Sequence, residues 1–383
     1  MTTMKQNKYE ESSLLMGLSE DLFLEILLRL PLKSLGRFKS VCKSWLSVIS
    51  NPEFARLHLQ SSNLATSNPR SMLTLQKHNM VSLFKFKSST DITKGVDLIP
   101  LNQQFVDVFL GGSCFIVGSC DGIVCLYIKS QEKCGEDLLH LWNPTTNENK
   151  QISLPGDQGL TYVHVDSSWF GYIPSLKDYM IFLVNTNIRG KPAFVKRMYI
   201  YSFRNPKWRE LHVTHEDLSF ALGSNSIFMN EALHCLVGRK FIHKFDLVAE
   251  TFERVPFSIK LDLLPKPHQI MLDVIGEKNG LCARFMHRSE IGEWMFELWM
   301  LEEYNKWNSW KKLYRIDLKK EIARNITRLL GFTYNGNLFI REKNALTVID
   351  PSQNPHLPII VCRATVFTVT DYVESLISPF YFA

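Results

Sequence analysis

The sequence lacks the patterns that take a chain out of the cell or into a membrane. No run of about twenty apolar residues occurs, so we expect no membrane-spanning helix. The first 17 residues hold no secretory core, because the apolar run at Leu14, Leu15 and Met16 is too short. The eight cysteines form no C-x-x-C pair. Without a signal peptide they are expected to be reduced thiols of a cytoplasmic or nuclear protein.

Motifs that carry catalysis or hold cofactors are also missing. There is no G-x-S-x-G elbow and no H-E-x-x-H helix, and neither glycine-rich stretch ends in the Gly-Lys-Ser/Thr of a phosphate loop. His212 and His215 offer two metal ligands, and four cysteines lie close together in sequence, but the gaps between these cysteines are wider than structural zinc prefers. Those cysteines are Cys114, Cys120, Cys125 and Cys134. We therefore expect no catalysis, no cofactor and no metal.

The overall composition describes a soluble globular protein of more than one domain. Hydrophobic residues make up 45% and charged residues 21% of a chain of 383 residues, which is long for one ordinary core. The formal net charge of +6 is mild for this length and gives no clustered patch with aromatic partners. We expect neither nucleic acid nor membrane among the partners.

Residues 18–49 carry the periodicity of short amphipathic helices. Apolar residues recur at spacings of three and four, and Pro31 ends the first helix because its ring fixes φ. The recurring residues are Leu22, Phe23, Ile26, Leu27, Leu30, Leu32, Leu35, Phe38, Val41, Trp45, Val48 and Ile49. A bundle of three such helices supplies only a few kcal/mol from its own core. Its apolar residues exceed one inner face, which favours a docking module.

Five basic residues and no acidic one lie between positions 29 and 43. They are Arg29, Lys33, Arg37, Lys39 and Lys43. A strip of one charge suits an acidic partner, mainly by steering the encounter and fixing the orientation. The alternative is a helical subdomain whose apolar stripe packs only on the rest of this chain.

This stretch resembles an F-box. The pattern of Leu, acidic, Leu, then Ile-Leu, Leu-Pro, Leu and Phe-Lys-x-Val-Cys-Lys-x-Trp is matched nearly throughout residues 18–45. Ser19 stands where the family usually has proline, but serine is a good N-cap, so a helix can still begin there. Gly36 also departs from the pattern. A glycine inside a helix lowers its stability by up to about 1 kcal/mol, but a glycine at a helix edge costs little.

The resemblance implies binding to the Skp-type adaptor of an SCF ubiquitin ligase and, through it, to cullin and RING subunits. The adaptor-binding residues that it implies are Leu18, Leu22, Ile26, Leu27, Leu30, Pro31, Leu35, Phe38, Val41, Cys42, Lys43 and Trp45. We expect a flexible N-terminus at 1–17, an all-α F-box domain at 18–60 and a linker at 61–70.

Residues 71–383 have the texture of an all-β domain. Short runs of Val, Ile, Phe, Tyr and Trp alternate with Gly, Asn, Asp and Pro clusters, and a unit of about fifty residues recurs. The repeats align on Asn143, Ser202, Asp246, Leu301 and Asp350, with gaps of 59, 44, 55 and 49 residues. This spacing predicts an irregular β-propeller, with a β-sandwich as the alternative.

The same pieces resemble the F-box-associated domain of plant F-box proteins. They include GSCDGIVCL, LWNPTTNENKQISLP, IHKFDLVAETFERVP and the closing YVESLISP. The resemblance implies that this domain binds the protein to be ubiquitylated. Some members, including the pollen S-locus F-box proteins, bind S-ribonucleases in self-incompatibility, and this chain resembles that subgroup in general layout. The target and the residues that bind it are not revealed by the sequence.

Two hypotheses follow from the sequence. The first is a non-catalytic receptor subunit of a ubiquitin ligase, and the second is a binding or scaffold propeller acting outside such a ligase. The tryptophans Trp294, Trp299, Trp307 and Trp310 suggest either stacking on a glycan or base, or packing within the propeller, and their strand and turn positions favour packing. The availability of Leu22, Ile26, Leu30 and Trp45 to a partner distinguishes the two hypotheses.

Overall fold

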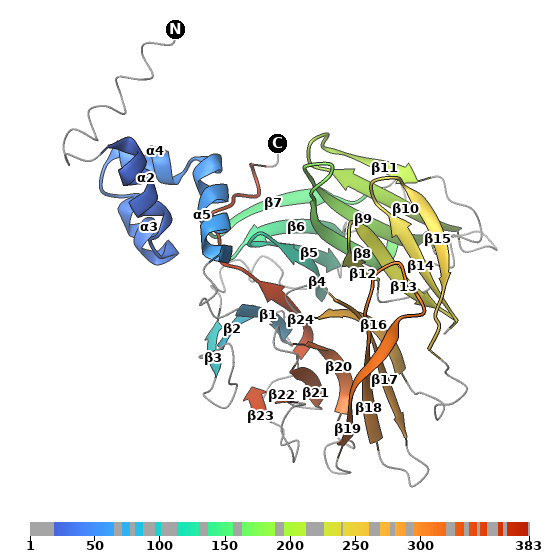
Figure 1. The fold of residues 1–383 in the computed structure, drawn as a ribbon. Helices are drawn as coiled ribbons and strands as arrows, with labels where there is room; N and C mark the ends of the chain where they lie inside the picture. Colours follow the sequence, from blue (N-terminus) through green and yellow to red (C-terminus); the bar gives the residue numbers. More distant parts are fainter. Residues whose placement is uncertain are drawn as a thin grey trace.

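A helical domain at the N-terminal end lies against one part of a larger all-β domain in the computed structural model (Figure 1). The structure describes residues 19–64, 71–76, 81–86, 96–100, 113–129, 137–155, 163–187, 195–211, 226–238, 240–259, 269–275, 280–288, 294–318, 326–332, 337–342, 345–350, 359–362 and 366–381. No helix in these segments is long and apolar enough to cross a membrane.

In the described segments the N-terminal domain contains four helices: α2 (Glu20–Leu28), α3 (Leu32–Phe38), α4 (Lys43–Ile49) and α5 (Pro52–Leu64). Ser19 caps α2, because its Oγ accepts from the backbone N–H of Leu22 at 3.3 Å, as the sequence predicted. Asn51 Oδ1 accepts from the N–H of Glu53 at 2.8 Å in the first turn of α5. Helix α5 runs past position 60 into the segment expected as a linker, and residues 65–70 lie outside the described segments.

The β domain consists of six four-stranded antiparallel sheets among the strands that the structure describes. One sheet contains β4 (Ser113–Cys120), β5 (Ile123–Lys129), β6 (Leu138–Asn143) and β7 (Glu148–Ser153), and the next contains β8 (Val163–Ile173), β9 (Asp178–Asn187), β10 (Val195–Ser202) and β11 (Lys207–Leu211). A third contains β12 (Ile227–Met229), β13 (Ala232–Val237), β14 (Phe241–Asp246) and β15 (Thr251–Pro256). A fourth contains β16 (Gln269–Ile275), β17 (Gly280–Arg288), β18 (Trp294–Leu301) and β19 (Trp310–Leu318). The other two contain β20 (Ile326–Phe332), β21 (Leu338–Glu342), β22 (Leu346–Ile349) and β23 (Ile359–Cys362); and β1 (Ser71–Gln76), β2 (Val81–Phe86), β3 (Val96–Pro100) and β24 (Val366–Tyr372).

The sheets are the blades of a β-propeller, which confirms the predicted fold and excludes the alternative of a β-sandwich. Five sheets pair their strands in chain order, and the sixth has the order β24-β1-β2-β3. Strands at one edge of neighbouring sheets contact one another, as β24 does with β4 and β4 with β8. The last strand in the chain, β24, pairs with β1 in antiparallel register. Both ends of the β domain therefore build one blade and close the ring.

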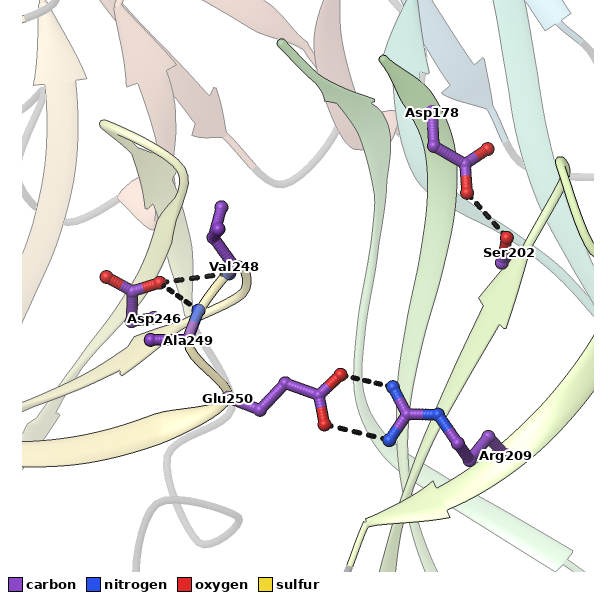
Figure 2. Close-up of polar contacts among 7 residues, drawn as sticks. All are labelled: Asp178, Ser202, Arg209, Asp246, Val248, Ala249 and Glu250. Carbon is purple, nitrogen blue, oxygen red and sulfur yellow. Dashed lines mark hydrogen bonds and ion pairs between the residues drawn. The ribbon is translucent and has the colours of Figure 1, made fainter. Parts of the chain in front are cut away.

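The sequence repeat has a physical cause in the turns that follow β6 and β14. Asp246 Oδ1 accepts from the N–H groups of Val248 and Ala249 at 2.9 and 2.8 Å, which holds the turn into the fourth strand (Figure 2). Asn143 Oδ1 accepts from the N–H groups of Thr145 and Thr146 in the matching turn. Side chains that accept from the backbone two residues on favour such turns, which explains why polar residues recur there.

Two tight hairpins have the backbone that their residues predict. Asp121 and Gly122 link β4 to β5 with φ of 51° and 82°, and Asn230 and Glu231 link β12 to β13 with φ of 49° and 58°. Positive φ at both central positions is the turn that matches the twist of a two-residue hairpin. At Gly122 a side chain would also meet Ser375, which lies far along the chain.

Polar contacts and apolar packing join neighbouring blades on the face where these turns lie. Arg209 on β11 donates to both carboxylate oxygens of Glu250 in the next blade (Figure 2). Ser175 donates through its N–H and its hydroxyl to Glu231, at 2.7 Å in each case. Between these blades, buried Phe182 packs on Phe245. The β8–β11 and β12–β15 blades are thus fixed to each other by side chains as well as by the ring closure.

The tryptophans of the β18–β19 hairpin pack between blades, as the sequence predicted. Trp299, Trp307 and Trp310 lie against buried residues of the β12–β15 and β16–β19 sheets, and Trp310 packs edge-on against Phe257. Trp294 lies under the guanidinium of Arg288, 4.8 Å from the ring centroid. Their aromatic area stabilises the blade junction.

His234 on β13 makes the stability of the protein dependent on pH. Burial, followed by the nearby Lys244, lowers the pKa of His234 to about 4 from an ordinary value of 6.5. Its Nε2 lies 2.9 Å from Tyr304 Oη, and its ring is fully buried. In the unfolded chain the imidazole binds a proton near pH 6.5, whereas the folded protein keeps it neutral, so acid favours unfolding.

We expect the free energy of unfolding to fall by about 2 kcal/mol between pH 7 and pH 5 because of His234. The measurement is urea unfolding of the native protein and of His234→Gln at both pH values. The variant should show a smaller fall over this interval, since glutamine does not titrate. Equal pH slopes in the two proteins would contradict the prediction.

Candidate functional site

Helix α2 has one face buried in the protein and another open to solvent. Leu27 is fully buried, whereas Leu22 and Ile26 are 51% and 47% exposed. These two exposed side chains lie four residues apart, one above the other on the same face of the helix. Apolar groups at helical spacing that the chain leaves in water are available to a partner.

Aromatic packing holds the helices together behind that face. Trp45 on α4 lies edge-on to Phe23 of α2 and to Phe38 of α3, with ring centroids 5.2 and 5.0 Å apart. Leu35 and Ile49 are buried in the same cluster, and Leu30 packs partly against it. These packed side chains hold the helix that carries Leu22 and Ile26 in place. Most of their own surface is buried within this chain.

Among the described side chains of the helical domain, four large apolar ones are exposed, and we call these four the docking strip. They are Leu22 at 51%, Ile26 at 47%, Val41 at 59% and Leu46 at 46% exposure. Leu46 was not among the residues selected from the sequence. The sequence signal for its exposure was its position five residues after Val41 and next to Trp45, which faces inward.

The other residues selected from the sequence fall into separate environments. Pro31, Cys42 and Lys43 are exposed beside the strip, and Leu18 lies outside the described segments. The Cys42 thiol receives a hydrogen bond from Ser44 and further ones from backbone N–H groups at the start of α4, which lower its pKa. Leu27 and Leu35 face the core, while Leu30, Phe38 and Trp45 are half-buried.

Five basic residues, which we call the basic rim, lie on the same helical domain as the docking strip. Arg29, Lys33, Arg37 and Lys43 are exposed, and Lys39 is half-exposed. Arg29 pairs with Glu25 one turn earlier on α2, in water, where such a pair contributes little to stability. The helical domain therefore presents exposed apolar side chains together with exposed positive charge.

The helical domain is joined to the propeller through one continuous core. His58 of α5 contacts the backbone oxygen of Leu30 at 2.9 Å, at the end of α2 where carbonyl groups lack helical partners. Phe54 and Leu59 of α5 share a buried cluster with Ile123 of β5 and with Leu376 near the C-terminus. The docking strip is thus carried by a body that includes the β4–β7 blade.

Two family models cover nearly the whole chain. The F-box domain matches residues 15–57, and the F-box associated beta propeller domain matches residues 71–380. The chain belongs to the F-box associated beta propeller family. The docking strip accordingly lies on the F-box domain of a plant-type F-box protein, with the propeller behind it.

Curated relatives align with most of this chain. An F-box/kelch-repeat protein of Arabidopsis thaliana is 26% identical over 369 residues, which cover 93% of this chain and 94% of the relative. F-box protein DOR of the same plant is 25% identical over 303 residues, covering 76% and 72%. The beta-propeller domain of the Trilobed protease from Pyrococcus furiosus superposes with a TM-score of 0.37 and 11% identity, over 65% of this chain and 72% of that one.

Metal ligands do not gather in the part of the F-box protein that the structure describes. No group of three or more His, Cys, Asp or Glu side chains there is placed to hold an ion. Cys114, Cys120 and Cys125 lie on β4 and β5, and burial raises the pKa of each thiol. His212, His215 and Cys134 lie outside the described segments.

Proposed function

We propose that this F-box protein is the substrate-recognition subunit of an SCF-type ubiquitin ligase. The docking strip binds a Skp-type adaptor, which links the protein to cullin and RING subunits, and the propeller binds the target protein. The observation that supports this most is the exposure of Leu22 and Ile26 on the domain that the F-box model matches. Each such side chain contributes roughly 1.5 to 3 kcal/mol when it passes from full exposure to full burial.

The mechanism that we propose is proximity and involves no chemistry on this chain. An adaptor held at the F-box and a target held at the propeller bring the target's lysines close to the ubiquitin-charged enzyme, which raises their effective concentration. The basic rim speeds the encounter with an acidic adaptor surface and fixes its orientation. We place this activity in the cytoplasm or the nucleus, where free thiols persist.

The test is adaptor binding by Leu22→Asp/Ile26→Asp, measured by calorimetry with a purified plant Skp-type adaptor. We expect binding at least a hundredfold weaker than that of the native protein, because the complex would bury two carboxylates in an apolar contact. Both positions are about half exposed in the free protein, so its circular dichroism and thermal midpoint should change little.

The matched control is Leu313→Asp/Ile360→Asp, which changes two apolar side chains of similar exposure on the propeller. This control should bind the adaptor as tightly as the native protein. A folded native protein that does not bind the adaptor would refute the receptor function and favour a scaffold propeller. Undiminished binding by the Leu22/Ile26 variant would remove the docking strip from the interface.

A further inference from the structure

The C-terminal segment after the last strand connects three parts of the molecule. Strand β24 completes the propeller by pairing with β1, and residues 373–381 then continue without regular structure toward the helical domain. We call residues 373–381 the C-terminal strap. Figure 1 shows this end of the chain beside α5 and the β4–β7 blade.

The β4–β7 blade holds the strap through a fully buried asparagine. Asn143 Nδ2 donates to the backbone oxygens of Ser375 and Ile377 at 3.0 and 2.7 Å. The Ser375 hydroxyl donates to the backbone oxygen of Asp121 at 2.6 Å, in the neighbouring turn. Tyr372, just before the strap, lies 2.9 Å from Thr145 through its hydroxyl. The strap is therefore fixed to two turns of one blade.

The far side of the strap contacts the F-box helices. Leu376 and Ile377 are buried in the same cluster as Ile49 of α4 and Phe54 of α5. Tyr381 Oη donates to the backbone oxygen of Ser50 at 2.7 Å, at the end of α4 where carbonyls need donors. One short segment thus touches the blade on one side and the helices that present the docking strip on the other.

We propose that the C-terminal strap sets the angle between the F-box and the propeller, and thereby positions a bound target relative to the ubiquitin-charged enzyme. The positional consequence rests on the proposed function; the mechanical role does not. Without the strap, α5 still shares its buried cluster with the blade, but the end of α4 loses a hydrogen bond and the cluster loses two buried side chains. Interfaces within a chain allow domain motion unless they are large and apolar. The F-box is then expected to rock about α5.

The mechanical role is testable by single-molecule energy transfer between the two domains. One dye is attached to Cys42, which is exposed, and the other to Leu313→Cys on the β16–β19 blade. Cys114, Cys125, Cys235 and Cys282 are buried and stay unlabelled, while the half-buried Cys120 and also Cys134 and Cys362 are replaced by serine. The test variant is Leu376→Ala/Ile377→Ala/Tyr381→Phe, which leaves β24 intact.

We expect one narrow distribution of transfer efficiency in the native chain and one at least twice as broad in the test variant. The matched control is Phe380→Ala, because this side chain is 54% exposed and lies within the same strap. It should keep the narrow distribution. A second variant that ends after Val373 should broaden the distribution further. If the test variant remains folded by circular dichroism and keeps the native distribution, the strap does not set the angle.

The positional consequence is read from self-ubiquitylation in a reconstituted ligase. The test variant should bind the adaptor as the native protein does, but the modified propeller lysines, mapped by mass spectrometry, should be spread over more sites. If the same lysines are modified in both proteins although the distribution of transfer efficiency is broader in the test variant, the positional role is refuted. A native chain that fails to bind the adaptor refutes the proposed function, while the energy-transfer experiment still decides the role of the strap.

Discussion

Replacing Asn143 with alanine is expected to lower the free energy of unfolding by about 4 kcal/mol. The side chain is fully buried and makes four hydrogen bonds, to two strap carbonyls and two turn N–H groups. Alanine leaves these backbone groups without their partner, and a buried unsatisfied group costs about 1 to 3 kcal/mol. The total loss is smaller than four such costs, because the strap can move toward solvent, where water hydrogen-bonds its backbone groups.

The measurement is urea unfolding followed by tryptophan fluorescence, with Asn149→Ala as the control. Asn149 lies on the outer strand β7 of the same blade and is exposed, so its loss should change stability by less than about 0.5 kcal/mol. Hydrogen exchange of the Asn143→Ala variant should be faster at residues 373–381 than in the native protein. A loss below about 1 kcal/mol would show that the hydrogen bonds of Asn143 do not hold the strap.

Substituting Gly122 with alanine is expected to destabilise the protein by about 4 kcal/mol or more. A Cβ atom there would lie 2.2 Å from Ser375 Oγ and 2.8 Å from the backbone oxygen of Val373. The residue also has a φ of +82°, a region that costs an L residue roughly 1 to 2 kcal/mol. Both the hairpin and the strap would have to shift.

Gly238→Ala separates the two causes of this loss. Gly238 also has a positive φ, of +59°, but no atom lies within 4 Å of the position of an added Cβ. Its substitution should therefore lower the free energy of unfolding by only about 1 kcal/mol. If the two alanine variants were equally stable in urea, the close approach of the strap to Gly122 would not matter for stability.

Local patterns predicted much of this structure, since they depend on neighbours in the chain. The N-cap at Ser19, the end of α2 near Pro31 and the polar residues that close β6 and β14 all follow from contacts within a few residues. Periodicity also marked the apolar faces of α2. It could not separate Ile26 from Leu27, because only the packing of α5 and the propeller decides which of these adjacent side chains is buried.

Features that join distant parts of the chain had no such signal. The strap sequence was recognised only as a piece typical of a family, and Asn143 meets Ser375 across 232 positions. The blade of β1, β2 and β3 was absent from the aligned repeats because its fourth strand comes from the other end of the domain. A search for a local repeat does not find a unit that the chain completes only at its end.

This closure determines the order in which a ribosome can deliver a finished protein. Strands β1, β2 and β3 emerge early, but their partner β24 begins only at Val366. At a synthesis rate of about 5 to 20 residues per second, the unfinished sheet waits for roughly 15 to 50 seconds. The F-box helices wait equally long for Leu376 and Ile377. A chain cut short by a premature stop would therefore lack both the closed ring and the contacts that fix the F-box to the propeller. The two domains can assemble fully only when synthesis of the chain is complete.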